Sequence, residues 1–74
     1  MPAHIRPLGQ LKSYIGDRLE IVVEAGPTVR ETLSTLSIPP EVVAGVIVNG
    51  ALQSKDYFIQ EDDMIQLIAV MGGG

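Results

Sequence analysis

The sequence predicts an α+β domain in which one helix packs on one face of a small mixed sheet. Three patterns predict this class: short segments that alternate between apolar and polar residues, one segment with helical spacing, and an Asn49-Gly50 turn between two apolar runs. The chain has 74 residues, enough for one domain, and the expected order is strand, strand, helix, strand, strand, strand. We expect one domain over residues 1–74, with a flexible glycine tail at 72–74.

The first two strands are expected over residues 3–8 and 18–24, joined as an antiparallel hairpin. In the second, alternation places Leu19, Ile21 and Val23 toward the core, opposite Val22. The segment between the strands, residues 9–17, contains two glycines and several polar residues and is expected to be a loop. Its apolar residues are expected to fold back over the core: Leu11, Tyr14 or Ile15.

A short helix is predicted to begin at Thr28, because Thr28 and Glu31 match a capping box. One apolar stripe follows at helical spacing: Val29, Leu33 and Leu36. The run Ile38-Pro39-Pro40 must end the helix, since a residue that precedes proline leaves the helical region.

The remaining strands are expected around the Asn49-Gly50 turn and at the end of the chain. Residues 45–48 are rich in β-branched side chains, and residues 51–52 begin a brief returning strand. The polar loop at 53–63 contains three expected core anchors: Tyr57, Phe58 and Ile59. Residues 64–71 form the last strand, with these side chains toward the core: Ile65, Leu67, Ala69 and Met71.

Composition excludes several classes of function. A net charge of −4 argues against a nucleic-acid module, which needs a basic patch. Without cysteine there is no disulfide framework, thiolate metal site or cysteine nucleophile, and the single histidine, His4, cannot supply multi-histidine chemistry. No apolar run approaches the ~20 residues that span a bilayer. We therefore expect a cytoplasmic protein that is monomeric when free, with no cofactor and no membrane partner.

The acidic run Glu61-Asp62-Asp63 is interpreted as a solvated turn rather than a metal site, because three consecutive acids do not converge on one ion. Asp56 is a further acidic residue nearby, and no basic side chain follows Lys55 in the sequence. An acidic surface near the tail could steer the protein to a basic partner.

The sheet face away from the helix is expected to be apolar, which suggests a partner surface. Four side chains define it: Val22, Ile47, Ile68 and Val70. The alternative is that the loop at 9–17 covers this face.

The chain ends in three glycines directly after a strong strand pattern. A glycine tail lacks Cβ atoms, so it can thread a narrow channel and present its carboxylate to another enzyme. A carboxylate is a poor electrophile until it is activated, so the tail is interpreted as a substrate handle rather than a catalyst. The alternative is a solvated tail with no role.

Three segments carry a family resemblance: Gly26-Pro27-Thr28-Val29, Val46-Ile47-Val48-Asn49-Gly50, and Asp63-Met64-Ile65-Gln66-Leu67 leading to Gly73-Gly74. In this order, over essentially the whole chain, they resemble the MoaD/ThiS-type sulfur carriers, which have the β-grasp, ubiquitin-like fold. Two departures are Asp62, where the family usually has glycine, and the pair Ala69 and Val70, where its molybdopterin branch often has proline.

The resemblance implies that an ATP-dependent, ubiquitin-activating-type enzyme adenylates the carboxylate of Gly74, and that Gly73 is the narrow residue that precedes it. Sulfur from a persulfide would then leave a thiocarboxylate, and the apolar face, extended by Met71 and Gly72, would bind the partners. The implied acceptor is the molybdopterin synthase large subunit or, alternatively, thiazole synthase in thiamine synthesis. A ubiquitin-like modifier conjugated through Gly74 and a plain interaction domain remain open as alternatives.

Overall fold

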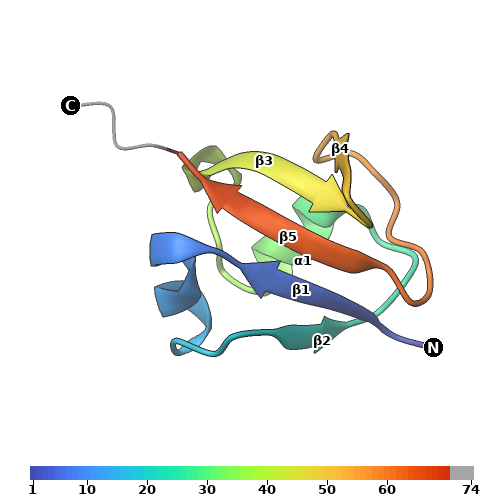
Figure 1. The fold of residues 1–74 in the computed structure, drawn as a ribbon, viewed down its shortest axis with the longest axis horizontal. Helices are drawn as coiled ribbons and strands as arrows, with labels where there is room; N and C mark the ends of the chain where they lie inside the picture. The colour runs from blue at the N-terminus through green and yellow to red at the C-terminus, as the bar shows by residue number, and fades with distance from the viewer. Residues whose placement is uncertain (71–74) are drawn as a thin grey trace.

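The computed structural model describes residues 1–70 and contains a five-stranded sheet with one α-helix against one face (Figure 1). In chain order the elements are β1 (Ala3–Pro7), the 3-10 helix η1 (Gly9–Ile15), β2 (Ile21–Val23), α1 (Val29–Thr35), the 3-10 helix η2 (Pro40–Val42), β3 (Val43–Val48), β4 (Ala51–Gln53) and β5 (Met64–Ala69). The strand order is β2-β1-β5-β3-β4. β1 and β5 pair in parallel at the centre and all other neighbours pair antiparallel, which confirms the predicted mixed sheet.

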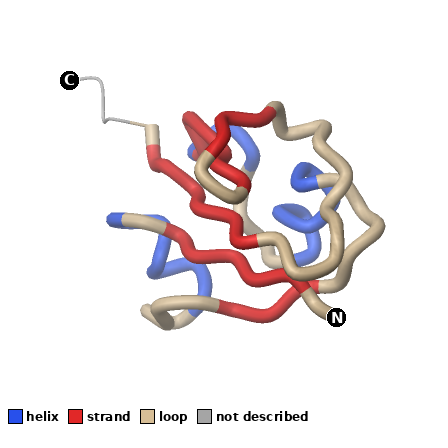
Figure 2. The backbone as a smooth tube through the Cα atoms, turned by 45° about the vertical axis from the view of Figure 1, so that its right-hand side comes forward, coloured by secondary structure: helices blue, strands red, loops and turns tan. Residues whose placement is uncertain are grey.

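The core lies between the sheet and α1, which form two layers (Figure 2). Its buried apolar side chains are Ala3, Ile5, Leu11, Val29, Leu33, Ile38, Val43, Val46, Val48, Ile59, Ile65 and Leu67. Every described strand except β2 and β4 contributes fully buried residues, in the alternation that a half-covered sheet requires.

Two local predictions, the capping box and the hairpin turn, are confirmed by specific hydrogen bonds and backbone angles. The Thr28 hydroxyl accepts from the Glu31 amide at 3.1 Å, and the Glu31 carboxylate accepts from the Thr28 amide at 2.8 Å. Asn49 and Gly50 have φ values of 51° and 86°, the positive pair that a two-residue hairpin turn requires. Asp62 also has a positive φ, 64°, as expected for a residue in a position that favours glycine.

The second strand is shorter than predicted, because β2 begins only at Ile21. The register that pairs Ile5 with Ile21 would place Pro7 opposite Leu19, and proline has no N–H to donate to that position. Leu19 is consequently 73% exposed, so its predicted core position is wrong. The predicted loop at 9–17 is largely η1, and Leu11 is its fully buried residue, as expected of a lid on the core.

The helix ends at Thr35, before the prolines that were expected to stop it. Ser37 adopts a left-handed φ of 61°, and the Ile38 amide reaches back to the Leu33 carbonyl at 2.9 Å. This pattern is a Schellman-type helix end with serine at the position that glycine usually occupies.

Candidate functional site

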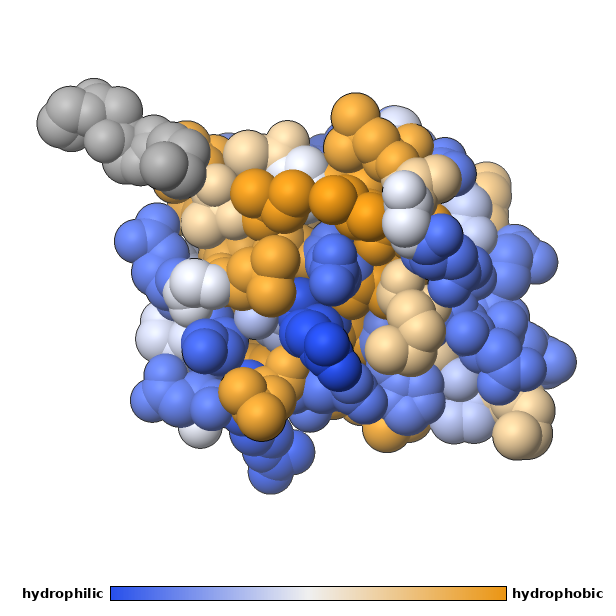
Figure 3. All heavy atoms as spheres, in the orientation of Figure 1, coloured by the Kyte–Doolittle hydropathy of each residue, from blue (hydrophilic) through white to orange (hydrophobic). Residues whose placement is uncertain are grey.

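The sheet face opposite α1 is uncovered in the described part of the chain, and Figure 3 looks onto it. Hydrophobic residues gather over β3, β4 and the C-terminal part of β5 in this view. We call four of them, together with Leu8 at the end of β1, the open-face patch; the four are Ile47, Leu52, Ile68 and Val70. The patch includes Val70, the last described residue, so it extends to the point where the described chain ends.

Strand pairing explains why these side chains meet. Ile47 pairs with Leu52 across the hairpin, and Gly45 pairs with Ile68 across β3 and β5. A Cβ at Gly45 would lie 3.7 Å from the terminal methyl groups of both Ile68 and Leu52, so these two side chains cover the glycine. Leu52 is 75% exposed, and because it adjoins other apolar side chains it forms part of a contiguous apolar surface of the kind that binds partners.

A polar group borders the patch on β1. Glu20 contacts Arg6 at 3.1 Å and His4 at 2.8 Å, and all three side chains are partly exposed. The hydrogen bond from Arg6 lowers the pKa of Glu20 below its ordinary value, and the adjacent His4 adds to this effect. The group fills the sheet face between β2 and β5, since His4 pairs with Val22 and Arg6 with Gln66.

The structure brings three of the predicted partner residues together and separates the fourth. Ile47, Ile68 and Val70 belong to the open-face patch. Val22 faces the same side of the sheet, but it lies on the edge strand β2, beyond the polar group. Sequence reasoning missed Leu8 and Leu52, although the two-residue turn already fixes Leu52 opposite Ile47.

The other predicted site residues, Met71, Gly72, Gly73 and Gly74, lie outside the described residues. Their roles stay predictions.

The acidic run has two different environments, which corrects its interpretation as a solvated turn. Glu61 and Asp62 are exposed, but Asp63 is only 4% exposed. The run also precedes β5, so it lies at the end of the strand away from the tail and gives no acidic surface there (Figure 1). Among residues 1–70 no group of three or more acidic or histidine side chains is placed to hold a metal ion.

Asp63 accepts three hydrogen bonds, and these identify it as a structural residue. Its carboxylate accepts from the Tyr57 hydroxyl at 2.7 Å, the Asn49 amide at 2.9 Å and the Gln60 backbone at 2.9 Å. Burial raises the pKa of Asp63, but the three donors outweigh burial and leave the pKa below its ordinary value. The Asn49 side chain also accepts from the Met64 amide, so the network ties the hairpin turn to the start of β5.

Phe58 is not the predicted core anchor, because its side chain is 62% exposed. It forms an isolated bridge with Thr28, which turns its ring outward while Ile59 enters the core. No helix in the described residues is long and apolar enough to cross a membrane.

Comparison with known proteins agrees with this architecture. The sequence matches the ThiS family over residues 5–74. No curated protein matches it. Among solved structures, SAMP1 from Haloferax volcanii aligns with a TM-score of 0.68 at 16% identity, with 100% of both chains covered. At this identity the likeness shows the fold alone, the ubiquitin-like β-grasp. The family match supports a small ubiquitin-like carrier protein, and the chain belongs to the ThiS family.

Proposed function

We propose that this protein is a sulfur carrier that reacts at the carboxylate of Gly74. The observation that supports this most is the open-face patch at the end of β5, beside the segment that leads to the reacting residue. An adenylating enzyme of the ubiquitin-activating type would transfer AMP from ATP to the carboxylate and release pyrophosphate. A persulfide sulfur would displace AMP, and a thiol would cleave the sulfur–sulfur bond to leave the thiocarboxylate. The chain has no cysteine, so the persulfide and the thiol both belong to partners.

The open-face patch is the proposed docking surface for the adenylating enzyme and for the sulfur acceptor. An enzyme that buries these apolar side chains would place the adjoining tail in its own active site, and Gly73 would pass through a narrow channel. The protein would act as a co-substrate in the cytoplasm rather than as an enzyme.

The molybdopterin synthase large subunit is the proposed acceptor, which would make this chain the small subunit of that synthase. The longer segment after β1, including Leu11 and Ile15, favours this branch. Thiazole synthase is the second candidate, which the ThiS family match and the short α1 favour. The glycine terminus and the β-grasp fold also fit a ubiquitin-like modifier joined to lysine through Gly74.

Intact mass spectrometry tests the proposal. The full chain is incubated with ATP, a persulfide donor and its cognate adenylating enzyme, and we expect a mass increase of one oxygen-to-sulfur exchange that maps to Gly74. Deletion of Gly74 should abolish the increase. A chain that stays unmodified would refute the carrier proposal, and conjugates of higher mass that depend on Gly74 would support the modifier instead.

Two substitutions test the docking surface separately from the tail. Leu52→Asp and Val70→Asp should leave the domain folded, because both side chains are exposed, and should slow adenylation by at least tenfold. Phe58→Asp is the matched control, since it places the same charge on an exposed hydrophobic residue outside the patch. Equal rates for all three variants would remove the patch from the proposal.

A further inference from the structure

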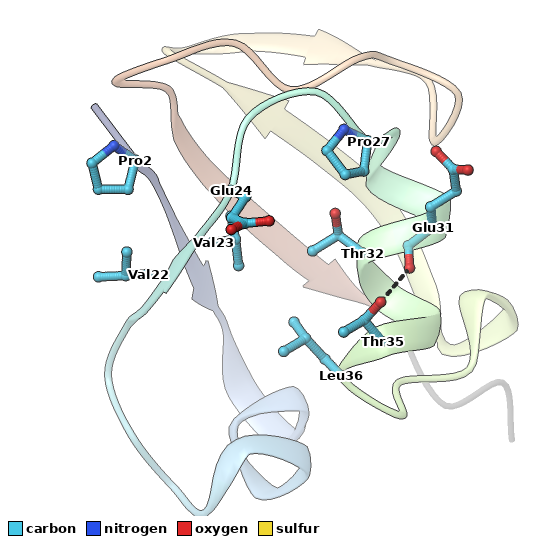
Figure 4. Close-up of a pocket in the computed structure, with 9 residues that line it drawn as sticks. All are labelled: Pro2, Val22, Val23, Glu24, Pro27, Glu31, Thr32, Thr35 and Leu36. Carbon is cyan, nitrogen blue, oxygen red and sulfur yellow. Dashed lines mark hydrogen bonds between the residues drawn. The ribbon is translucent and has the colours of Figure 1, made fainter.

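The edge strand β2 and helix α1 border a groove of about 620 Å³ that is separate from the open-face patch (Figure 4). Its walls come from the N-terminal segment, β2 and α1: Pro2, Val22, Val23, Glu24, Pro27, Glu31, Thr32, Thr35 and Leu36. In Figure 4, Val23 and Leu36 point into the space between strand and helix, whereas Val22 points to the other side of β2. We call this the β2–α1 groove.

The outer edge of β2 offers backbone hydrogen-bonding groups to an incoming strand. The His4 amide donates to the Asp63 carbonyl just before β5, and the Leu8 amide donates to Leu67 on β5, so both residues direct their backbone groups away from β2. The hydrogen-bonded pairs with β2 are therefore Ala3 with Val23 and Ile5 with Ile21. Val22 lies between these pairs, so its N–H and C=O point outward from the sheet.

The charges beside this edge decide which occupant fits. Glu24 lines the groove, and in Figure 4 its carboxylate points toward α1, while Glu31 lies on the opposite wall. Glu20, by contrast, is paired with Arg6 and His4 on the open face of the sheet and does not line the groove. The groove lining thus contains two carboxylates and no basic side chain, and a second copy would bring its own net charge of −4 against them. The edge therefore disfavours a second copy and favours a basic partner.

We propose that the β2–α1 groove binds an extended segment of a partner protein, which adds to β2 as a further strand and carries Lys or Arg beside its apolar residues. Backbone bonds to Val22 supply the pairing, and every second side chain of the segment enters the groove against Val23 and Leu36. The lysine or arginine pairs with Glu24. Because β2 and β4 are opposite edges of the sheet, the bound segment leaves the open-face patch free. This second docking surface does not depend on the proposed sulfur chemistry.

NMR titration of the full chain tests the proposal with a synthetic peptide in which Val and Ile alternate with Thr and both ends carry Lys. We expect the amide signals of Val22, Glu24 and Leu36 to shift, and the amide exchange of Val22 to slow. A peptide with Glu in place of Lys should bind at least tenfold more weakly. Shifts confined to the open-face patch, or no shifts, would overturn the proposal.

Val22→Pro is the sharpest variant, because it removes the outward N–H without removing a donor to β1. It should weaken peptide binding about fivefold, the equivalent of one hydrogen bond of about 1 kcal/mol. Val22→Thr keeps the N–H and the β-branched shape and should bind as the parent chain does. Equal binding by both variants would refute strand addition.

Thr35→Arg provides a second test that does not touch the sheet. Thr35 is exposed on α1 and lines the groove, so arginine there would obstruct the groove and repel the peptide's Lys residues. We expect the loss of peptide binding from a folded protein. Sedimentation that shows a dimer of the parent chain but not of Val22→Pro would assign the edge to a second copy and overturn the proposal.

Discussion

Replacement of Tyr57 by Phe isolates one bond of the network around Asp63. The substitution removes the hydroxyl that donates to the Asp63 carboxylate at 2.7 Å and keeps the ring, which packs against the core. A hydrogen bond to a charged group contributes about 1.5–3 kcal/mol. We expect a loss near the lower end, because the same carboxylate oxygen still accepts from the Gln60 amide.

That loss is a large fraction of the stability of so small a domain, whose core supplies about 3–5 kcal/mol. For a domain of this size the melting temperature falls by roughly 4–8 °C for each kcal/mol. Urea unfolding followed by circular dichroism measures the free energy directly, and the melting temperature provides an independent check.

The pH dependence distinguishes a bond to a carboxylate from simple packing. The pKa of Asp63 lies below its ordinary value of 3.8 in the folded protein. Ionised Asp63 therefore stabilises the fold above that pH, and this contribution is lost as the pH falls through the folded pKa. The cost of Tyr57→Phe should accordingly be greatest at neutral pH and decrease by about half in acid, where a neutral bond of ~0.5–1.5 kcal/mol remains.

Tyr14→Phe is the matched control, because the Tyr14 hydroxyl makes no hydrogen bond to any residue of the described chain. Its effect should stay within about 0.5 kcal/mol at every pH. If Tyr57→Phe cost the same at neutral and acid pH, the carboxylate would not be the source of its stability, and the reasoning would fail.

Three further substitutions test the backbone argument and the same network. Asp62→Gly should stabilise the domain by about 0.5–1 kcal/mol in urea unfolding, because glycine adopts the φ of 64° without the cost that a side chain incurs. Thr28→Ala removes the capping hydroxyl and should cost about 1 kcal/mol in the same assay. Hydrogen bonding to Asp63 raises the pKa of Tyr57, so Asp63→Asn should shift the alkaline absorbance titration of Tyr57 toward lower pH.

Local chemistry in the sequence was sufficient to predict the elements that depend on neighbouring residues. The capping box at Thr28 and the turn at Asn49-Gly50 are set by bonds within four residues, so both were predictable. Alternation along residues 64–69 likewise identified the buried face of β5, where Ile65 and Leu67 enter the core.

Features that depend on distant pairing were not predictable. The length of β2 depends on Pro7 lying opposite Leu19, which requires the register with β1. Asp63 resembles its acidic neighbours in the sequence, and only the fold shows that three donors surround it. The open-face patch was predicted only in part. Alternation shows which face of the sheet a side chain lies on, but not which strands are neighbours. The prediction therefore grouped Val22, on the edge strand β2, with residues that it does not contact.

The size of the chain explains why both proposed binding sites lie on the exterior of the sheet. One helix covers one face, so the opposite face remains open, and a five-stranded sheet that does not close has two free edges. Of these, β2 is only three residues long, and the groove beside it contains Glu24 and Glu31, which disfavours a second copy of this acidic chain. The same charges favour a basic strand, so the feature that protects this edge from self-association also selects its partner. Because the open-face patch lies on the other half of the sheet, a protein held at β2 could remain bound while the tail reacts in a second enzyme.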